Sequence, residues 1–281
     1  MSLYEKAPAK INLCLNVLRK REDGFHEMEM IMTPIDLADR LTFNLQPKKI
    51  SLDSNSSFMP LDERNIVYQT ARLLKETYQV KQGVDIFIEK NIPIAAGLGG
   101  GSSDAAATLR GLNRLWNLNL TLDQLALLGE QVGSDVPFCV YNRTAFVTGR
   151  GDVVEPIEVF PKSWVILVKP PKGISSWTVF KNLEITSLPT YDIQSMREKI
   201  ENGSYQEAVR FAGNALEVQA TKQNPLIIEV KEKMIRFGAD TALMSGTGPT
   251  VYGLTQNLKK AKRIVNGLKG FCREVYLVRT L

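Results

Sequence analysis

The fold is decided by the stretch Pro93-Ile94-Ala95-Ala96-Gly97-Leu98-Gly99-Gly100-Gly101-Ser102-Ser103-Asp104-Ala105, which lies between a predicted strand and a strongly predicted helix. Its glycines allow backbone N–H groups to approach an anion without interference from Cβ atoms. The helix that follows adds unsatisfied donors and about half a positive charge at its N-terminus. A flexible linker, the alternative, would need neither the proline, nor the apolar Leu98, nor a helix that begins at once. The run Pro93–Ser103 is therefore predicted to bind phosphate, with the serine hydroxyls as further donors or as a metal ligand.

Two other glycine motifs do not fit this stretch. A P-loop requires Gly, four residues and then Gly-Lys-Ser/Thr, but no lysine occurs between Asn91 and Ala126. In a dinucleotide-binding fold, the third glycine counted from Gly97 would stand where Ser102 does, and the acidic residue expected about twenty positions further on is missing. The stretch is therefore a different kind of phosphate loop.

Hydrophobic periodicity predicts strands and helices on both sides of the loop. A period of two residues near the N-terminus, broken at Asp23-Gly24, predicts a sheet, and Thr121 with Gln124 predicts a capping box that opens a helix. Gly238 is expected to end another helix as its C-cap. The other predicted helices cover 66–78, 102–116, 205–216, 227–237 and 257–268, and the predicted strands cover 11–17, 41–45, 84–88, 145–148, 164–168, 242–244, 251–254 and 274–278.

The length and composition predict two globular domains. The chain has 281 residues, of which 44% are hydrophobic and 23% are charged, which is enough apolar material for a core and a length at which cores usually divide. A stretch rich in proline, glycine and serine, 169–187, is the best candidate for a domain junction. We expect domains at 1–160 and 161–281, and the alternation of helices and strands in the second predicts an α+β layer of helices on an antiparallel sheet.

Charge and cysteine content set limits on partners and location. The net charge is only +5, and a basic cluster near the C-terminus is expected to be a solvated helix face rather than a nucleic-acid patch. The three cysteines are far apart, which favours a reduced cytoplasm, and neither a signal peptide nor a membrane span is recognisable. We expect no nucleic-acid or membrane partner, and either a monomer or a homodimer. The basic cluster comprises Lys259, Lys260, Lys262 and Arg263.

Three motifs in order resemble the kinase superfamily named for galactokinase, homoserine kinase, mevalonate kinase and phosphomevalonate kinase (GHMP). Residues 93–103 resemble its ATP-binding motif, Pro8-Ala9-Lys10-Ile11-Asn12 its N-terminal motif, and Ser245-Gly246-Thr247-Gly248-Pro249-Thr250-Val251 its C-terminal glycine loop. The resemblance implies a ribosomal-protein-S5-domain-2-like N-terminal domain and a ferredoxin-like C-terminal α/β sandwich. It also implies ATP as the phosphoryl donor, together with Mg²⁺.

Two further motifs are Arg21-Glu22-Asp23-Gly24-Phe25-His26 and Gly133-Ser134-Asp135-Val136-Pro137-Phe138. Both resemble signatures of one family within that superfamily, the 4-diphosphocytidyl-2-C-methyl-D-erythritol kinases. The family more often has Tyr at position 25 and Ala at position 134. The resemblance implies ATP-dependent phosphorylation of the 2-hydroxyl of a cytidine-diphosphate-linked methylerythritol in the non-mevalonate isoprenoid pathway. A GHMP kinase with another small alcohol as substrate, a non-catalytic nucleotide-binding regulator and an RNA-binding protein of similar fold are the alternatives.

Lys10 and Asp135 are the candidate catalytic residues. Lys10 lies on a predicted strand beside apolar neighbours, so its ammonium group must either reach solvent at an edge or meet an anion. Asp135 lies between turn residues and Pro137, where a carboxylate serves as a helix cap or as a fixed base. The resemblance implies that Asp135 is the catalytic base and that Lys10 assists it electrostatically.

The resemblance also implies binding roles for residues outside the glycine run. His26 would hydrogen-bond the cytosine between the rings of Phe25 and Phe180, although Phe180 fits an ordinary core position nearly as well. Asn12 and Thr247 would contact the substrate, and Asn65 would either bind adenine or cap the helix that follows it. Ser103 is the candidate protein ligand for Mg²⁺.

Overall fold

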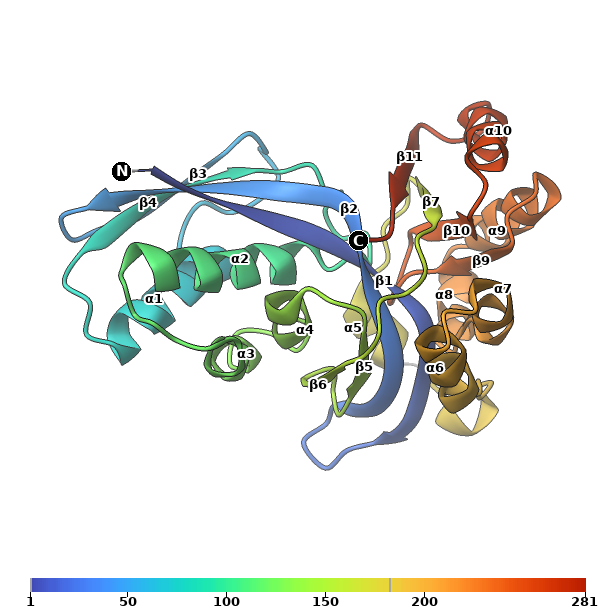
Figure 1. Ribbon diagram of the computed structural model, residues 1–281, viewed down its shortest axis with the longest axis horizontal. Helices are drawn as coiled ribbons and strands as arrows, with labels where there is room; N and C mark the ends of the chain where they lie inside the picture. Colours follow the sequence, from blue (N-terminus) through green and yellow to red (C-terminus); the bar gives the residue numbers. More distant parts are fainter. Residues whose placement is uncertain (1, 182) are drawn as a thin grey trace. The chain divides into compact units, whose positions relative to one another are not determined.

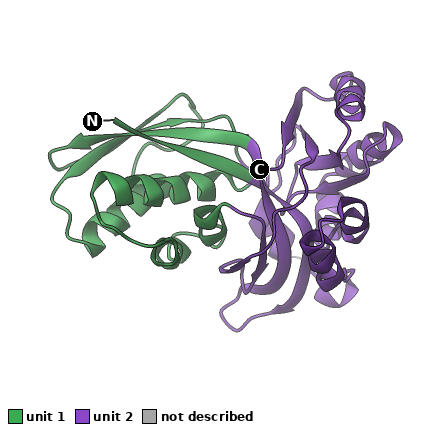
Figure 2. Cartoon of the chain, in the orientation of Figure 1, with its two compact units in different colours: residues 1–9, 37–94, 99–142 green, residues 10–36, 95–98, 143–281 purple. Residues whose placement is uncertain are grey.

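The computed structural model describes residues 2–181 and 183–281 and has an α+β architecture (Figure 1). Contacts divide the chain into two compact units (Figure 2), with 1–9, 37–94 and 99–142 in unit 1 and 10–36, 95–98 and 143–281 in unit 2. The long strands β1 (Ser2–Lys20) and β2 (His26–Gln46) each contribute residues to both units. No single cut along the chain therefore separates the units, and the boundary expected near residue 160 stays a prediction.

Unit 1 is a sheet covered by helices along one face (Figure 1). Its strands follow the order β3-β4-β2-β1, in which β4 runs antiparallel to β2 and parallel to β3. Helix α2 packs closely on β2, because a Cβ atom at Gly111 would lie 2.6 Å from the buried ring of Phe43. The additional elements of this unit are β3 (Ile50–Ser54), β4 (Gly83–Glu89), α1 (Ile66–Thr77), α2 (Gly100–Leu115), α3 (Leu122–Glu130) and α4 (Val136–Tyr141).

Unit 2 contains a second, fully antiparallel sheet in the order β11-β7-β10-β9. Helices α9 and α10 pack on this sheet, as expected for an α+β layer. The unit also holds the second half of β1, which pairs in parallel with β8, and the first half of β2, which pairs with β5. The sheet strands are β7 (Trp164–Lys169), β9 (Thr241–Met244), β10 (Val251–Thr255) and β11 (Glu274–Arg279). The shorter strands are β5 (Ala145–Thr148), β6 (Val153–Pro156) and β8 (Gly213–Asn214). The helices are α5 (Ser176–Lys181), α6 (Ile193–Glu201), α7 (Tyr205–Ala208), α8 (Glu217–Gln223), α9 (Leu226–Arg236) and α10 (Leu258–Lys269), with 3₁₀ turns η1 (Ile185–Ser187) and η2 (Val209–Phe211).

Several local predictions are confirmed. Thr121 and Gln124 form both hydrogen bonds of a capping box at the start of α3. Gly238 follows the end of α9 with φ +106°, the left-handed conformation expected of a C-cap glycine. Among residues 2–181 and 183–281, no helix is long and apolar enough to cross a bilayer.

The predicted helix over 205–216 is wrong. The helix ends at Ala208, a 3₁₀ turn follows, and Gly213 and Asn214 become β8. Tertiary contacts override the helical pattern here, because Gly213 pairs with Cys14 and a Cβ atom on it would lie 2.1 Å from the ring of Tyr191. The side chain of Asn214 also donates to the carbonyl of Gly246, which requires an extended backbone at this point.

Candidate active site

Parts of all three GHMP-like motifs meet within unit 2. The backbone N–H of Lys10 donates to the carbonyl of Leu98 at 2.9 Å, which joins the N-terminal motif to the glycine run. The hydroxyl of Ser245 donates to the carbonyl of Gly97 at 2.9 Å, which joins the C-terminal loop to the same run. Segments that are far apart in the sequence are therefore held together by hydrogen bonds, as the motif pattern predicts.

Glycines are required where these loops approach each other. Gly97 has φ +75°, and a Cβ atom on it would lie 2.3 Å from the carbonyl oxygen of Ser245. Gly246 has φ +56°, and a Cβ atom there would lie 3.4 Å from Nζ of Lys10. Ala95, which is not a glycine, also has a positive φ of 52°. Strain of this kind is found where a backbone is held in one geometry for a ligand.

Lys10 is a buried lysine and not a solvated edge residue. The residue is only 4% exposed, and Nζ of its side chain donates to Oδ1 of Asn12 at 2.8 Å. Asn12 is fully buried. Its side-chain nitrogen donates to the sulfur of Met30, and its backbone carbonyl accepts from the hydroxyl of Tyr252. Because charge is costly to bury, an ammonium group in this position favours binding of an anion nearby.

The other part of the glycine run opens helix α2 in unit 1. Gly99 is the N-cap residue with φ +69° and has no side chain with which to cap the helix. The first backbone N–H groups of α2 therefore face the region before the helix, which is the geometry of an anion site. Ser103 in the first turn is buried, and its hydroxyl donates to the carbonyl of Pro8 at 2.7 Å. Because this bond uses the hydroxyl proton, Ser103 would have to bind Mg²⁺ through the lone pairs of its oxygen.

Asp135 occupies the N-cap position of α4 but does not act as its cap. The residue is half-buried, and its carboxylate makes no capping hydrogen bond with the helix. Pro137, early in α4, lacks an N–H donor in any case. The alternative role of Asp135 as a capping residue is therefore not seen, and its role as the catalytic base stays a prediction.

A buried ion cluster, which the sequence patterns did not reveal, fastens both ends of the glycine run in unit 1. Nζ of Lys90 lies 2.5 Å from Oδ2 of Asp39 and 2.7 Å from Oδ2 of Asp104. Oδ1 of Asp39 accepts from the N–H groups of Asn91 and Ile92, just before the run. Asp104 lies just after the run, near the start of α2. The cluster of Asp39, Lys90 and Asp104 thus links the residues just before the glycine run to the residue just after it.

Burial raises the pKa of Asp104 to about 8, an effect that Lys90 opposes and the charge of Asp39 reinforces. Oδ1 of Asp104 is buried without a hydrogen-bond partner. Both observations fit a neutral carboxyl group at pH 7, since two carboxylates against one ammonium would leave a buried negative charge.

Substitution Asp104→Asn is expected to flatten the pH dependence of stability. In the folded protein Asp104 keeps its proton up to about pH 8, whereas in the unfolded chain it loses the proton near its ordinary pKa of about 3.9. The folded state binds more protons between these values, so stability must fall as pH rises through that window. In the parent protein we expect the free energy of unfolding to fall by at least about 1 kcal/mol between about pH 5 and about pH 8, and in Asp104→Asn we expect this fall to be absent. Urea unfolding at a series of pH values measures both.

The control for this experiment is Asp53→Asn, the same substitution at an exposed carboxylate of unit 1. It should keep the pH dependence of the parent protein. If the free energy of unfolding changed equally with pH in the parent protein and in Asp104→Asn, the assignment of a raised pKa to Asp104 would be contradicted.

His26 and Phe180 form a stacked aromatic pair in unit 2, with ring centroids 5.0 Å apart and planes inclined by 24°. Burial, with the charge of Lys20, lowers the pKa of His26, so its imidazole is neutral at pH 7. A neutral imidazole offers one donor and one acceptor. Phe25 is 49% exposed, and the guanidinium of Arg150 lies 5.3 Å from the centre of its ring. Phe180 is half-buried rather than fully enclosed, which favours a stacking surface over a core position.

The two remaining predicted binding residues are placed as follows. Asn65 caps α1, because its Oδ1 accepts from the N–H of Val67 while its amide nitrogen donates to the carbonyl of Pro60. Capping is thus confirmed, and contact with adenine stays a prediction. The hydroxyls of Thr247 and Ser176 lie 2.7 Å apart.

Family models match both halves of the chain. Residues 65–143 match the model described as GHMP kinases N terminal domain, and residues 196–274 match the one described as GHMP kinases C terminal. A 4-diphosphocytidyl-2-C-methyl-D-erythritol kinase of Enterococcus faecalis is 53% identical, with the whole of each chain covered. The protein of that name from Bacillus subtilis is 54% identical over 100% of this chain and 98% of its own.

Solved structures agree with these matches. A crystal structure of 4-(cytidine 5'-diphospho)-2C-methyl-D-erythritol kinase superposes with a TM-score of 0.83 at 31% identity, covering 99% of both chains. A homoserine kinase from Cytophaga hutchinsonii superposes with a TM-score of 0.78 at 19% identity, covering 98% of this chain and 94% of its own. The second likeness is one of fold alone.

Proposed function

Because the chain belongs to the 4-diphosphocytidyl-2-C-methyl-D-erythritol kinase family of GHMP kinases, we propose that it transfers the γ-phosphoryl group of ATP to the 2-hydroxyl of 4-diphosphocytidyl-2-C-methyl-D-erythritol. The products are the 2-phosphate and ADP, in the non-mevalonate isoprenoid pathway. The observation that carries the phosphoryl-transfer chemistry is the meeting of the three motifs beside buried Lys10. The full-length identity of 53% to a kinase of this name supports the choice of substrate.

The proposed mechanism is direct in-line transfer without a phosphoenzyme. The triphosphate lies against the glycine run, whose backbone N–H groups hold the phosphates. The oxygen of the substrate hydroxyl attacks the γ-phosphorus while its proton passes to the carboxylate of Asp135, and the bond to the β-phosphate oxygen breaks. The ammonium group of Lys10 stabilises the negative charge that develops, an electrostatic role.

The residues present fit a Mg²⁺ ion that enters with ATP and is held mainly by phosphate and water. Among the residues the structure describes, no cluster of three or more His, Cys, Asp or Glu side chains is arranged to hold a metal ion. Mg²⁺ commonly keeps several waters and binds substrate phosphates with one or two protein ligands. The ion would neutralise charge on the β- and γ-phosphates, and the oxygen of Ser103 is the protein ligand that we propose.

We assign recognition of the cytosine to the stacked pair of His26 and Phe180, with Phe25 as a second aromatic surface. A neutral imidazole matches a base edge that carries both donors and acceptors, and stacking is worth about 1 to 3 kcal/mol per base in nucleic-acid sites. Asn12 and Thr247 are proposed to contact the rest of the acceptor, and Asn65 to lie beside the adenine. We also propose a cytoplasmic location, without a nucleic-acid partner.

A substrate panel tests this function. With ATP and Mg²⁺ we expect phosphorylation of 4-diphosphocytidyl-2-C-methyl-D-erythritol and none of mevalonate or homoserine, measured as ADP formed. His26→Ala should raise KM for the cytidine compound by about 5- to 100-fold, because the cytosine would lose its contact with the imidazole ring. Faster phosphorylation of mevalonate or homoserine than of the cytidine compound would show that the protein acts on a different acceptor. ATP binding without phosphorylation of any compound would favour a regulator.

A further inference from the structure

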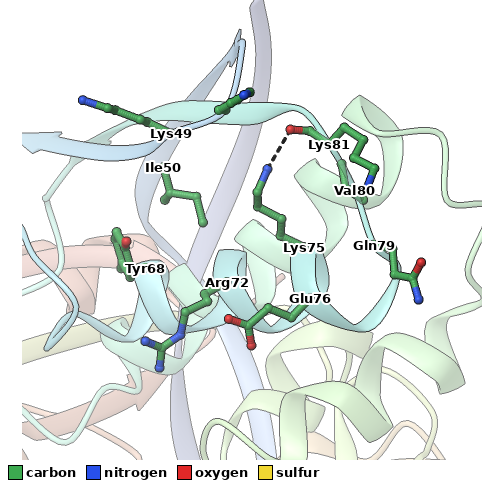
Figure 3. A pocket seen from close by; sticks show the side chains of 10 residues that line it. Lys49, Ile50, Tyr68, Arg72, Lys75, Glu76, Gln79, Val80 and Lys81 are labelled. Atoms are coloured by element: carbon green, nitrogen blue, oxygen red, sulfur yellow. Dashed lines mark hydrogen bonds between the residues drawn. The ribbon is translucent and has the colours of Figure 1, made fainter.

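A pocket with mainly charged and polar side chains in its lining lies in unit 1 at the later turns of α1 (Figure 3). It has a volume of about 530 Å³, within the range of small-molecule sites. One wall is a face of α1 that includes Tyr68, Arg72 and Lys75 at helical spacing, and the opposite walls are the start of β3 and the connection from α1 to β4. The glycine run lies near the other end of α1, where a Cβ atom on Gly101 would lie 3.9 Å from Ile66. The nine steps from Ile66 to Lys75 span about 13.5 Å along the helix axis.

The charged side chains that line the pocket are mostly basic. Its cations are Lys48, Lys49, Arg72, Lys75 and Lys81, which together we call the basic pocket, and its only acidic lining residue is Glu76. Five positive charges against one negative charge leave +4 in the lining. A concave surface with charge of one sign concentrates the potential and attracts counter-ions.

Most of this charge is not neutralised within the protein. Arg72 lies 3.6 Å from a carboxylate oxygen of Glu63, but Lys48, Lys49 and Lys81 form no ion pair with any residue of 2–181 and 183–281. Lys75 donates to the backbone carbonyls of Lys81 and Gln82 rather than to a carboxylate. Burial and the charge of Lys81 lower the pKa of Lys75, the direction that repulsion between cations produces. A bound anion would relieve this repulsion.

The walls of the pocket are fixed in place before any ligand binds. The bonds from Lys75 tie the connection after α1 to the helix, as Figure 3 shows for the carbonyl of Lys81. The N–H of Val84 donates to the carbonyl of Lys49 at 2.9 Å, and a Cβ atom on Gly83 would lie only 2.0 Å from that same carbonyl oxygen. The strand β4 thus holds the backbone that carries Lys49 in one position. A prearranged site loses less entropy on binding.

We propose that the basic pocket binds a small molecule that carries a di- or triphosphate group, at a site separate from the glycine run. Several lysines and an arginine around one cavity match a multiply charged phosphate group, since charge-assisted hydrogen bonds to phosphate are the strong ones. Tyr68, Ile50 and Val80 supply an aromatic and apolar surface for an organic part of the ligand. The cations line one pocket of about 530 Å³ rather than an extended stripe, which favours a small ligand over a nucleic acid.

Titration of the full chain with inorganic tripolyphosphate, followed by the backbone amide signals in two-dimensional NMR, tests this proposal. Because the glycine run is itself proposed to bind phosphate, the location of the shifts distinguishes the two sites. We expect shifts at 48–50 and 79–82 in addition to any at 97–103. The double variant Lys49→Gln with Lys81→Gln should weaken the response at 48–50 and 79–82 by at least about tenfold, because two charge-assisted contacts are lost.

The matched control is Lys259→Gln with Lys262→Gln, which removes two exposed lysines from α10 in unit 2. Its affinity at the basic pocket should stay within about twofold of the parent protein, because neither lysine lines the pocket. Citrate should bind at least about tenfold more weakly than tripolyphosphate, since it carries less charge.

Three results would overturn the proposal. One is the absence of shifts at 48–50 and 79–82. Another is citrate binding as tightly as tripolyphosphate, which would remove the selectivity for phosphate. The third is a short single-stranded RNA that shifts the same amides at lower concentration, which would make the partner a nucleic acid. Shifts confined to 97–103 would leave the proposed function standing while removing the second site.

Discussion

Substitution Asp135→Asn is expected to lower kcat by about 10²- to 10⁴-fold, the usual contribution of a positioned general base. The amide has nearly the same shape but cannot accept the proton of the attacking hydroxyl. Because ATP is proposed to bind at the glycine run, its affinity should stay nearly unchanged. Turnover in the steady state and ATP binding by calorimetry measure the two effects separately.

The control for this substitution is Asp123→Asn, which changes a carboxylate of the same unit that accepts a hydrogen bond from the hydroxyl of Tyr141. It should retain the turnover of the parent enzyme. Turnover near that of the parent in Asp135→Asn would remove Asp135 from the role of base. A loss of ATP affinity equal to the loss of kcat would instead indicate that the residue shapes the nucleotide site.

The second large effect is expected for Gly97→Ala, with a loss of roughly 2 to 4 kcal/mol in the free energy of unfolding. The new Cβ atom would lie 2.3 Å from the carbonyl oxygen of Ser245, so one of the two loops must move. The positive φ of 75° adds strain for any residue with a side chain. The movement would break the hydrogen bond from Ser245 to Gly97. KM for ATP should therefore rise together with the loss of stability, which chemical denaturation measures.

Gly203→Ala separates the two causes. Gly203 has φ +69°, but a Cβ atom there would meet nothing within 4 Å. It should lose only the strain component, about 1 to 2 kcal/mol, and keep the KM for ATP. Equal losses in the two variants would show that the contact between Gly97 and Ser245 contributes nothing. If Gly97→Ala does not fold, the folded Gly203→Ala protein still establishes that backbone strain alone is tolerated.

Local patterns predicted much of the fold because they depend on neighbours along the chain. The capping box at Thr121 and the glycine that ends α9 follow from spacing within a few residues, and the structure confirms both. The α+β class follows from the order of helices and strands and is confirmed as well. The helix that follows the glycine run was predictable for the same reason, and binding of phosphate by the run stays a prediction.

Features that depend on distant residues could not be predicted in this way. Lys90 meets Asp39, which is 51 positions away, and no periodicity relates the two. Residues 213 and 214 look helical beside their neighbours, yet they pair with β1 near the N-terminus. At the alternate positions 35, 37, 39, 41 and 43 of β2, Asp39 is the one residue that is not apolar, and this break in the two-residue pattern is the sequence signal that would have drawn attention to the ion cluster.

The long strand β1 has a consequence for the newly synthesised chain. Cys14 and Leu15 pair with Gly213 and Asn214, so one edge of β1 cannot be completed until most of the polypeptide has been translated. At typical rates of about 5 to 20 residues per second, the delay is roughly ten to forty seconds. During that time the edge exposes unpaired backbone groups of the kind to which other nascent chains add. A truncated product that ends before residue 213 keeps this edge unpaired, and we expect such a product to aggregate.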